Sequence, residues 1–236
     1  MEAPPKAPIL TAPQPPPTSH PRRSWLLVIG IGLIVGGLVG GSAAFVLVRN
    51  AHNQQLPASC REIGCSELGS GASPAFALSD QNGRSISLDS LKGKVVVLGF
   101  MDPVCTNICP IVSNEFIKAD RLLGSDAAKV AFVSVNVNQF HESQDAVRAY
   151  SRKRGLDALS NWYFVTGSTT RLKQVWDAYH VAVIPNSSGD VVHTSILYFI
   201  DPQGRLRIDA LPVQAKGSIV TWARSITDLV RYLQSH

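Results

Sequence analysis

Two apolar runs near the middle of the chain constrain its fold more than any other feature. They read KVVVLGF at 94–100 and KVAFVSVNV at 129–137, and neither contains a charged side chain after its first lysine. A strand with one face in water alternates apolar and polar residues, whereas a strand that is apolar throughout is covered on both faces. The two runs therefore predict two buried strands inside an α/β sheet, with helices packed on each side.

The rest of the C-terminal part alternates between helix and strand patterns. In chain order, the predicted segments are a helix from Pro110, a strand at 129–137, a helix at 143–154, a strand at 161–167, a helix at 169–179, strands at 193–201 and 205–211, and a helix at 217–233. Two turns are predicted, at Asn82–Gly83 and at Asp201–Gly204. This order predicts one thioredoxin-like α/β sandwich over residues 74–236.

The N-terminal part has a different character. Residues 1–23 are rich in proline and predict a disordered tail. Residues 24–48 carry no charge, and 25 residues rising about 1.5 Å each exceed the hydrocarbon thickness of about 30 Å. We interpret them as a single transmembrane helix. Arg22 and Arg23 before the span favour a cytoplasmic tail and a domain that faces the periplasm from a bacterial inner membrane.

Two other interpretations of this span fit less well. A cleavable signal peptide has a shorter apolar region and a small-residue cleavage site, which this segment lacks. A lipoprotein signal ending at Cys60 would have leucine where Pro57 stands, and it would lie closer to the span. Small residues recur at 32, 36, 40 and 44, so one helix face is smooth. That face is either a homodimer contact or simply faces lipid, and both interpretations stay open.

The charge of the chain argues against one class of partner. The formal net charge is +5, but residues 1–50 supply +3 of it, and from Ala51 onward 18 basic residues face 16 acidic ones. Cationic proteins that bind nucleic acid gather lysine and arginine among aromatic residues, and no such cluster follows the span. We therefore expect no nucleic-acid partner.

Four cysteines divide into two pairs. Cys60 and Cys65 lie in a Ser/Gly/Pro-rich segment at 49–73, interpreted as a linker. An exported chain permits disulfides, so we expect a small local disulfide between them. The alternative is a second metal or redox pair, although no histidine or methionine stands beside them.

Cys105 and Cys109 follow the first apolar run and precede Pro110. The carboxyl end of a parallel strand and the start of a helix are where α/β sheets place their sites, and the helix dipole there favours a thiolate. Three intervening residues put the sulfurs one helical turn apart, where they can converge on an ion. Two thiolates favour Cu(I), with zinc as the competitor, and leave room for a third donor. A structural disulfide, two core thiols and a redox couple stay open as alternatives.

The third donor is usually an imidazole, and the chain has six histidines. His20, His52 and His236 lie in the tail, the linker and the C-terminus, which argues against them. His193 directly precedes a predicted strand, His141 follows the carboxyl end of another, and His180 follows a helix. The residues alone leave these three candidates open.

Five segments occur in a fixed order along the chain. They are PAFALSDQNG at 74–83, LKGKVVVLGF at 91–100, Cys-x-x-x-Cys-Pro at 105–110, WYFVTGS at 162–168 and HTSILYFIDPQG at 193–204. In this order they resemble the SCO/SenC family, thioredoxin-fold copper proteins that assist the assembly of cytochrome c oxidase. The resemblance covers 74–236, and the preceding membrane anchor also fits.

The resemblance implies a ligand set and a partner. Cys105, Cys109 and His193 would bind copper as Cu(I), with Cu(II) as a second candidate. The protein would deliver copper to the copper-centre subunit of cytochrome c oxidase, reduce the cysteines of that centre, or both. Two departures weaken the assignment of the oxidase more than that of the metal. The family's Asp-Pro-x-x-Asp-Thr-Pro segment is replaced by NVNQFHESQD, and Val192 stands where an aspartate often precedes the histidine.

Three other functions compete with the copper function. An exported thiol–disulfide oxidoreductase would use Cys105 and Cys109 without stable metal binding, and it is the only enzyme activity that we retain as an alternative. A peroxiredoxin-like peroxidase fits poorly, because Pro103 is one place too close to Cys109 for the Pro-x-x-x-Thr-x-x-Cys pattern. A purely structural adaptor leaves the cysteine loop unexplained.

Overall fold

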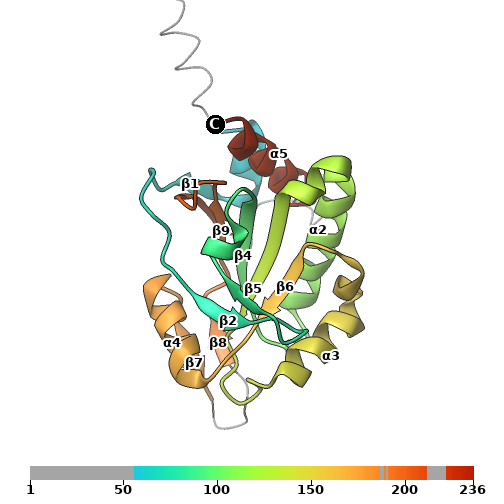
Figure 1. Ribbon diagram of the computed structural model, residues 1–236, viewed down its shortest axis with the longest axis vertical. Helices are drawn as coiled ribbons and strands as arrows, with labels where there is room; N and C mark the ends of the chain where they lie inside the picture. The colour runs from blue at the N-terminus through green and yellow to red at the C-terminus, as the bar shows by residue number, and fades with distance from the viewer. Residues whose placement is uncertain (1–55, 187–188, 190, 212–221) are drawn as a thin grey trace, which may run out of the picture. The chain divides into compact units, whose positions relative to one another are not determined.

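A six-stranded mixed sheet forms the centre of the structure, a computed structural model that describes residues 56–186, 189, 191–211 and 222–236 (Figure 1). Its order is β1-β10-β9-β4-β5-β6. The strands are β1 (Cys65–Glu67), β4 (Val95–Met101), β5 (Val130–Asn136), β6 (Trp162–Val165), β9 (Leu197–Ile200) and β10 (Leu206–Ala210). β4, β5 and β6 are parallel to one another, whereas β9 is antiparallel to β4, and β10 and β1 continue the antiparallel side.

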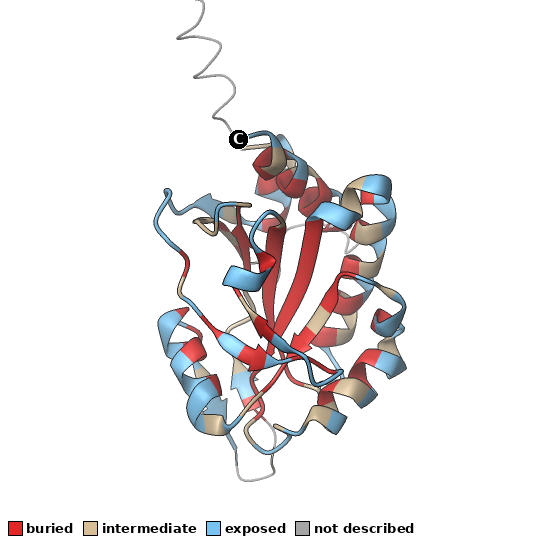
Figure 2. Ribbon diagram, viewed as in Figure 1, coloured by how far each residue is buried: buried red, intermediate tan, exposed pale blue. Residues whose placement is uncertain are grey.

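The two apolar runs are the central strands β4 and β5, and all seven residues of each strand are buried (Figure 2). Their side chains alternate between two cores. Val95, Val97 and Met101 face one core, and Val96, Leu98 and Phe100 face the other. The prediction of strands covered on both faces is confirmed.

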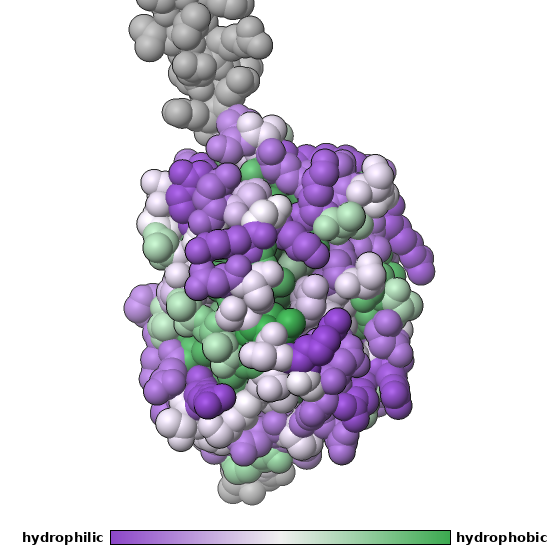
Figure 3. Space-filling view, viewed as in Figure 1, coloured by the Kyte–Doolittle hydropathy of each residue, from purple (hydrophilic) through white to green (hydrophobic). Residues whose placement is uncertain are grey.

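Helices cover both faces of the sheet. The core on one side contains residues of α2 (Ile108–Leu123), α3 (Gln144–Arg154) and α5 (Trp222–Ser235). The other core contains residues of α4 (Thr169–Ala178) and of the hairpin β2 (Ala77–Ser79) and β3 (Ser85–Ser87). Short 3₁₀ helices complete the unit: η1 (Ala58–Ile63), η2 (Asp89–Leu91), η3 (Gly124–Lys129) and η4 (Leu156–Ala158). Polar side chains dominate the face in Figure 3, and apolar ones gather near its middle.

Both predicted turns are present, and they are built alike. The sequences DQNGR at 80–84 and DPQGR at 201–205 each begin with a buried aspartate, and each has its glycine at positive φ. The Oδ1 atom of Asp201 accepts the N–H groups of Gln203 and Arg205, while Oδ2 accepts from Arg205 Nε at 2.6 Å. Asp80 holds its own turn through the same three kinds of contact. Each aspartate thus satisfies the backbone of a sharp turn and pairs with an arginine.

The folded unit begins earlier than predicted. Residues 56–73 were interpreted as part of a linker, but β1 pairs with β10, and Ile63 is buried in the core. The unit therefore extends from Leu56 to His236 rather than from position 74. The predicted disulfide is confirmed, since Cys60 and Cys65 are bonded, with their Cα atoms 5.2 Å apart. It joins η1 to the edge strand of the sheet.

A second small hairpin was not predicted. β7 (Val183–Pro185) pairs with β8 (Val191–His193), so the strand expected at 193–201 is in fact two strands, β8 and β9. Three-residue strands are too short to show a period in the sequence. Ile184 and Val192, on facing strands, are 63% and 66% exposed. The final helix, expected from residue 217, is described from Trp222 onward.

The predictions for the N-terminal part lie outside the described residues. They are the tail at 1–23, the transmembrane helix at 24–48, the smooth face that would support a homodimer and the first residues of the linker. Within the part of the chain that is described, no helix has the length and apolarity needed to cross a bilayer.

We expect Asp201→Ala to lower the free energy of unfolding by about 2 kcal/mol, because it leaves two backbone N–H groups and Arg205 without their acceptor. Urea denaturation of the variant and the wild type measures this change. Asp89→Ala is the matched control, since Asp89 is exposed and its carboxylate pairs with the exposed Lys92. Equal losses in the two variants would contradict a role for the buried turn aspartate.

Candidate metal and redox site

Both free cysteines lie where β4 gives way to α2. Cys105 is in the connecting loop and partly exposed, whereas Cys109 is in the first turn of α2 and only 1% exposed. Asn107 caps the helix, since its Oδ1 atom accepts the N–H of Ile108 at 2.6 Å. The first turn of α2 therefore holds Cys109, whereas Cys105 lies in the loop three residues before the helix begins.

The two thiols have opposite acidities. Cys105 Sγ accepts the N–H of Cys109 at 3.4 Å, and as a thiol it donates to Asn107 Oδ1 at 3.0 Å. A hydrogen bond from the Cys109 thiol, supported by backbone N–H groups, lowers the pKa of Cys105 to about 6. The same hydrogen bond and burial raise the pKa of Cys109. At neutral pH the pair is one thiolate beside one thiol.

His193 lies on β8 and is partly buried. Its Nδ1 atom lies 3.0 Å from the carbonyl oxygen of Thr194. A carbonyl only accepts, so the proton is on Nδ1, and Nε2 carries a free lone pair. Burial lowers the pKa of His193, which keeps the ring neutral. A neutral imidazole held by a backbone carbonyl is the usual state of a metal-binding histidine.

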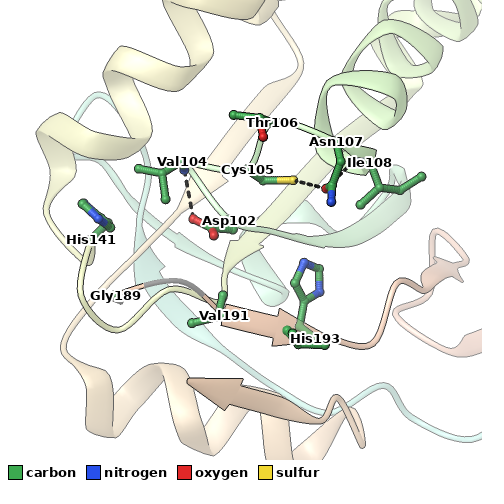
Figure 4. Close-up of a pocket in the computed structure, with 11 residues that line it drawn as sticks. Asp102, Val104, Cys105, Thr106, Asn107, Ile108, His141, Gly189, Val191 and His193 are labelled. Atoms are coloured by element: carbon green, nitrogen blue, oxygen red, sulfur yellow. Dashed lines mark hydrogen bonds between the residues drawn. The ribbon is translucent and has the colours of Figure 1, made fainter. Parts of the chain in front are cut away.

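The direction of β9 explains how His193 reaches the cysteine loop. β9 runs antiparallel to β4, and Leu197 pairs with Gly99 near the carboxyl end of β4. Residues that precede β9 therefore lie at the edge where the cysteine loop begins. Figure 4 shows the His193 ring extending from β8 into the space beneath Cys105 and Asn107.

One cavity connects these groups. It has a volume of about 440 Å³ and is lined by Asp102, Val104, Cys105, Thr106, Asn107, Ile108, His141, Gly189, Val191, Val192 and His193. Cys109 lies buried behind the loop rather than in the lining. Among the described residues, no three histidine, cysteine, aspartate or glutamate side chains are grouped closely enough to hold a metal ion. The structure thus places Cys105 and His193 at one cavity without assembling a complete ligand set.

The other histidine candidates differ in whether they line this cavity. His141 lines the same cavity, on the opposite side from His193 in Figure 4. His180 follows α4 with a positive φ of 54° and does not line the cavity. His236 contacts Tyr232 at the end of α5, whereas His20 and His52 lie outside the described residues.

Sequence reasoning missed the polar residues that join the loops of this edge. Asp102 Oδ1 accepts the N–H of Val104 at 2.9 Å and Nδ2 of Asn138 at 3.0 Å. The same Nδ2 atom lies 3.4 Å from the carbonyl oxygen of Gly189, between β7 and β8. Asn138 therefore joins three loops. The signal available in the sequence was that Asp102 and Asn138 are polar residues just beyond the two apolar runs. The structure shows that both are buried, where polar groups need partners.

A second buried contact supports Cys109. Ser113 Oγ donates to the carbonyl oxygen of Cys109 at 2.8 Å and lies 3.0 Å from the hydroxyl oxygen of Tyr150. Burial raises the pKa of Tyr150, so its phenol stays protonated. This chain of contacts ties the first turn of α2 to α3.

We expect iodoacetamide to alkylate Cys105 of the reduced protein with a rate that rises through about pH 6 and is constant above pH 7, because only the thiolate reacts. Cys109 should react far more slowly, since it is buried and protonated. Mass spectrometry of tryptic peptides separates the two. Cys109→Ala removes the thiol donor and should move the midpoint upward, toward that of an ordinary cysteine. An unchanged midpoint would show that Cys109 does not set the acidity of Cys105.

Comparison with known proteins agrees with this arrangement. The sequence profile of the SCO1/SenC family matches residues 67–229. A SCO1 protein homolog from Bacillus subtilis is 26% identical over 137 residues, which cover 57% of this chain and 70% of that protein. The thiol-disulfide oxidoreductase ResA from the same organism is 33% identical over 137 residues, covering 56% of this chain and 62% of ResA.

A solved structure extends the likeness to the fold. The structure of ScoI from Bradyrhizobium japonicum with copper bound has a TM-score of 0.57 and 26% identity, and the match covers 69% of this chain and 100% of that one. The thioredoxin-like α/β sandwich expected from the sequence is confirmed by this likeness. The profile spans well over half of the chain, and so the protein belongs to the SCO1/SenC family.

Proposed function

We propose that this protein is a membrane-anchored copper chaperone that binds copper through Cys105, Cys109 and His193. The observation that carries the proposal is the shared cavity, onto which a partly exposed, acidic thiol and a neutral imidazole both open. Cys109, four positions after Cys105 and in the first turn of α2, supplies the second sulfur.

The proposed ligand atoms are of the chemical types that copper binds. Thiolate sulfur and neutral imidazole nitrogen are ligands that Cu(I) accepts, and Nε2 of His193 is the free nitrogen. Copper is bound in the related ScoI structure. In the present arrangement the three donors are not grouped, so loading requires His193 and the sulfurs to approach each other. We infer that Cu(I) is the principal cargo, with Cu(II) as a second candidate.

The family suggests the acceptor. We infer that copper passes to the copper-centre subunit of cytochrome c oxidase by ligand exchange, in which the acceptor's sulfurs replace Cys105 and Cys109 one at a time. The same pair can instead reduce the cysteines of that centre. In this chain Val192 precedes His193 and is exposed, so no carboxylate at that position orients the ring. The carbonyl oxygen of Thr194 has that role here.

The location follows from the sequence. We propose that residues 24–48 anchor the chain in a bacterial inner membrane and that the folded unit faces the periplasm. The bonded pair Cys60–Cys65 supports this proposal, because disulfides persist in oxidising compartments. The anchored form also suits an acceptor that is itself in the membrane.

We expect the reduced protein to bind one Cu(I), and Cys105→Ser/Cys109→Ser to abolish that binding in a competition titration with a Cu(I) chelator. His193→Ala should retain the sulfurs and weaken the affinity by at least about 10- to 100-fold, because that is the usual loss when only a hydrogen-bond partner of a ligand is removed, and here the ligand itself is removed. His141→Ala is the matched control, since His141 lines the same cavity without belonging to the proposed ligand set.

Two results would contradict this assignment. Equal affinity and stoichiometry in the wild type and the double cysteine variant would remove the copper function. Equal weakening by His193→Ala and His141→Ala would remove the specific role of His193. Both titrations omit the acceptor protein, so they test the metal site alone.

A second candidate is a thiol–disulfide oxidoreductase that does not bind metal stably. The observation in its favour is the asymmetry of the pair, a partly exposed acidic thiol beside a buried protonated one, together with the likeness to ResA. Such an enzyme attacks through Cys105 and resolves through Cys109. If metal-free protein reduces a protein disulfide catalytically and His193→Ala leaves the rate unchanged, this function is favoured over the chaperone.

We expect the apparent copper affinity to fall as the pH is lowered. Between pH 8 and pH 7, Cys105 is already a thiolate, so copper displaces only the proton of Cys109, and the affinity should fall about 10-fold per pH unit. Below pH 6 both sulfurs carry protons, and the slope should approach about 100-fold per unit. Chelator competition across this range measures both slopes. An affinity independent of pH would contradict binding by two thiolates.

A further inference from the structure

A second cavity lies on the α3 side of the cysteine loop. Its volume is about 370 Å³, a size typical of ligand pockets. It is lined by Pro103, Val104, Cys105, His141, Ala146, Ala149, Tyr150, Lys153 and Arg154. Val104 and Cys105 line this cavity and the larger one as well, so Cys105 is accessible from two sides. We call the second cavity the α3 groove.

The α3 groove is basic. Lys153 and Arg154, from the last turn of α3, line it, and its described lining contains no aspartate or glutamate. In the part of the chain that the structure describes, no ion pair joins either residue to a carboxylate. Two cations without an anionic partner, in the cavity that the partly exposed Cys105 also lines, indicate an anionic ligand.

Arg154 is held in place but incompletely satisfied. Its guanidinium carbon lies 5.5 Å from the centre of the Tyr150 ring, and Tyr150 itself is buried. The Nε atom of Arg154 is buried and has no hydrogen-bond partner among the described residues. A buried donor without an acceptor is unfavourable. Arg154 as a whole is only partly buried and lines the groove, so its guanidinium can donate a charge-assisted hydrogen bond to a carboxylate that enters there. The position therefore suits a carboxylate.

We propose that the α3 groove docks an extended segment of the acceptor protein that carries a cysteine and, beside it, an acidic residue. The cysteine would meet Cys105, and the acidic side chain would pair with Arg154. Val104, which is 44% exposed, offers an apolar contact next to the sulfur. This proposal rests on the proposed function, because it describes how a thiol-bearing acceptor reaches the candidate copper site.

The chemistry at the docked position is thiol–disulfide exchange. The Cys105 thiolate attacks one sulfur of an acceptor disulfide, the acceptor S–S bond breaks, and the other acceptor sulfur leaves as a thiolate. Cys109 then loses its proton to water and attacks Cys105 Sγ, which forms the Cys105–Cys109 disulfide and releases the second acceptor thiolate. Two electrons pass from the pair to the acceptor. The acidic neighbour takes no part in bond making, and it determines which cysteine docks.

The test uses the full chain with Cys109→Ser, in which Cys105 is the only free thiol, since Cys60 and Cys65 are bonded. The probes are three peptides that differ only in the residue after a single cysteine, which is Glu, Gln or Lys, and each cysteine is activated as a neutral 2-thiopyridyl disulfide. Release of thiopyridone gives the second-order rate of attack by Cys105. We expect the Glu peptide to react about 3- to 10-fold faster than the Gln peptide, and the Lys peptide to react more slowly than both.

Variants on α3 identify the residue responsible. Arg154→Gln should abolish the preference for Glu, and Arg154→Lys should retain part of it, because lysine keeps the charge and loses the planar fork. Arg152→Gln is the matched control, since it removes the same charge from an exposed neighbour that does not line the groove. Equal rates for the three peptides would overturn the proposal. So would an equal loss of preference in Arg152→Gln and Arg154→Gln, which would indicate only long-range attraction.

The outcomes separate this proposal from the copper function. With Cys109 restored, Arg154→Gln should bind Cu(I) with the stoichiometry of the wild type, because Arg154 is not in the proposed ligand set. If copper binding fails in the wild type while the Glu preference depends on Arg154, docking stands and the copper function does not. If the preference is absent while copper binds, docking is wrong and the copper function is unaffected.

Discussion

The structure depends on how β4 is paired. It is buried on both faces and hydrogen-bonded on both edges, to the parallel strand β5 and to the antiparallel strand β9. A parallel neighbour brings its carboxyl end to the same edge as that of β4, and an antiparallel neighbour brings its amino end there. The cysteine loop, the loop that contains Asn138 and the approach to β9 therefore meet at one edge. This is why residues as distant in the chain as Cys105 and His193 share a cavity.

The asymmetry of the cysteine pair links the two chemistries proposed for it. The same hydrogen bond lowers the pKa of Cys105 and raises the pKa of Cys109. The pair therefore consists of one nucleophilic thiolate and one thiol that keeps its proton. In the proposed copper site the metal would displace that proton, and disulfide formation would remove it as well. Metal loading and oxidation therefore compete for the same two sulfurs. A carrier built in this way can hold copper only while its pair is reduced.

Much of the fold could be predicted from the sequence, because its strongest patterns are local. Residues close together in the sequence determine each feature that was predicted correctly. These features are the strands β4 and β5, the two aspartate turns and the Cys60–Cys65 disulfide. The errors concern pairings between distant segments. β1 is held in the sheet by its pairing with β10, and β8 forms by pairing with β7. Strands of three residues are too short to show a two-residue period in the sequence, so neither strand was predicted. The same reason hid Asn138, whose partners lie in two other loops.

The incomplete grouping of the donors has a physical rationale in a carrier. A site that holds three donors at fixed positions binds its metal tightly and releases it slowly, because every ligand must leave a preorganised position. Here Cys109 lies in the first turn of α2 and Cys105 lies in the loop before it, whereas His193 lies on a separate hairpin that Asn138 joins to the cysteine loop by a long contact of 3.4 Å. Part of the binding free energy would then be spent on bringing His193 to the sulfurs. That lowers the affinity without changing the ligands, and an acceptor can displace the imidazole first and the sulfurs afterwards.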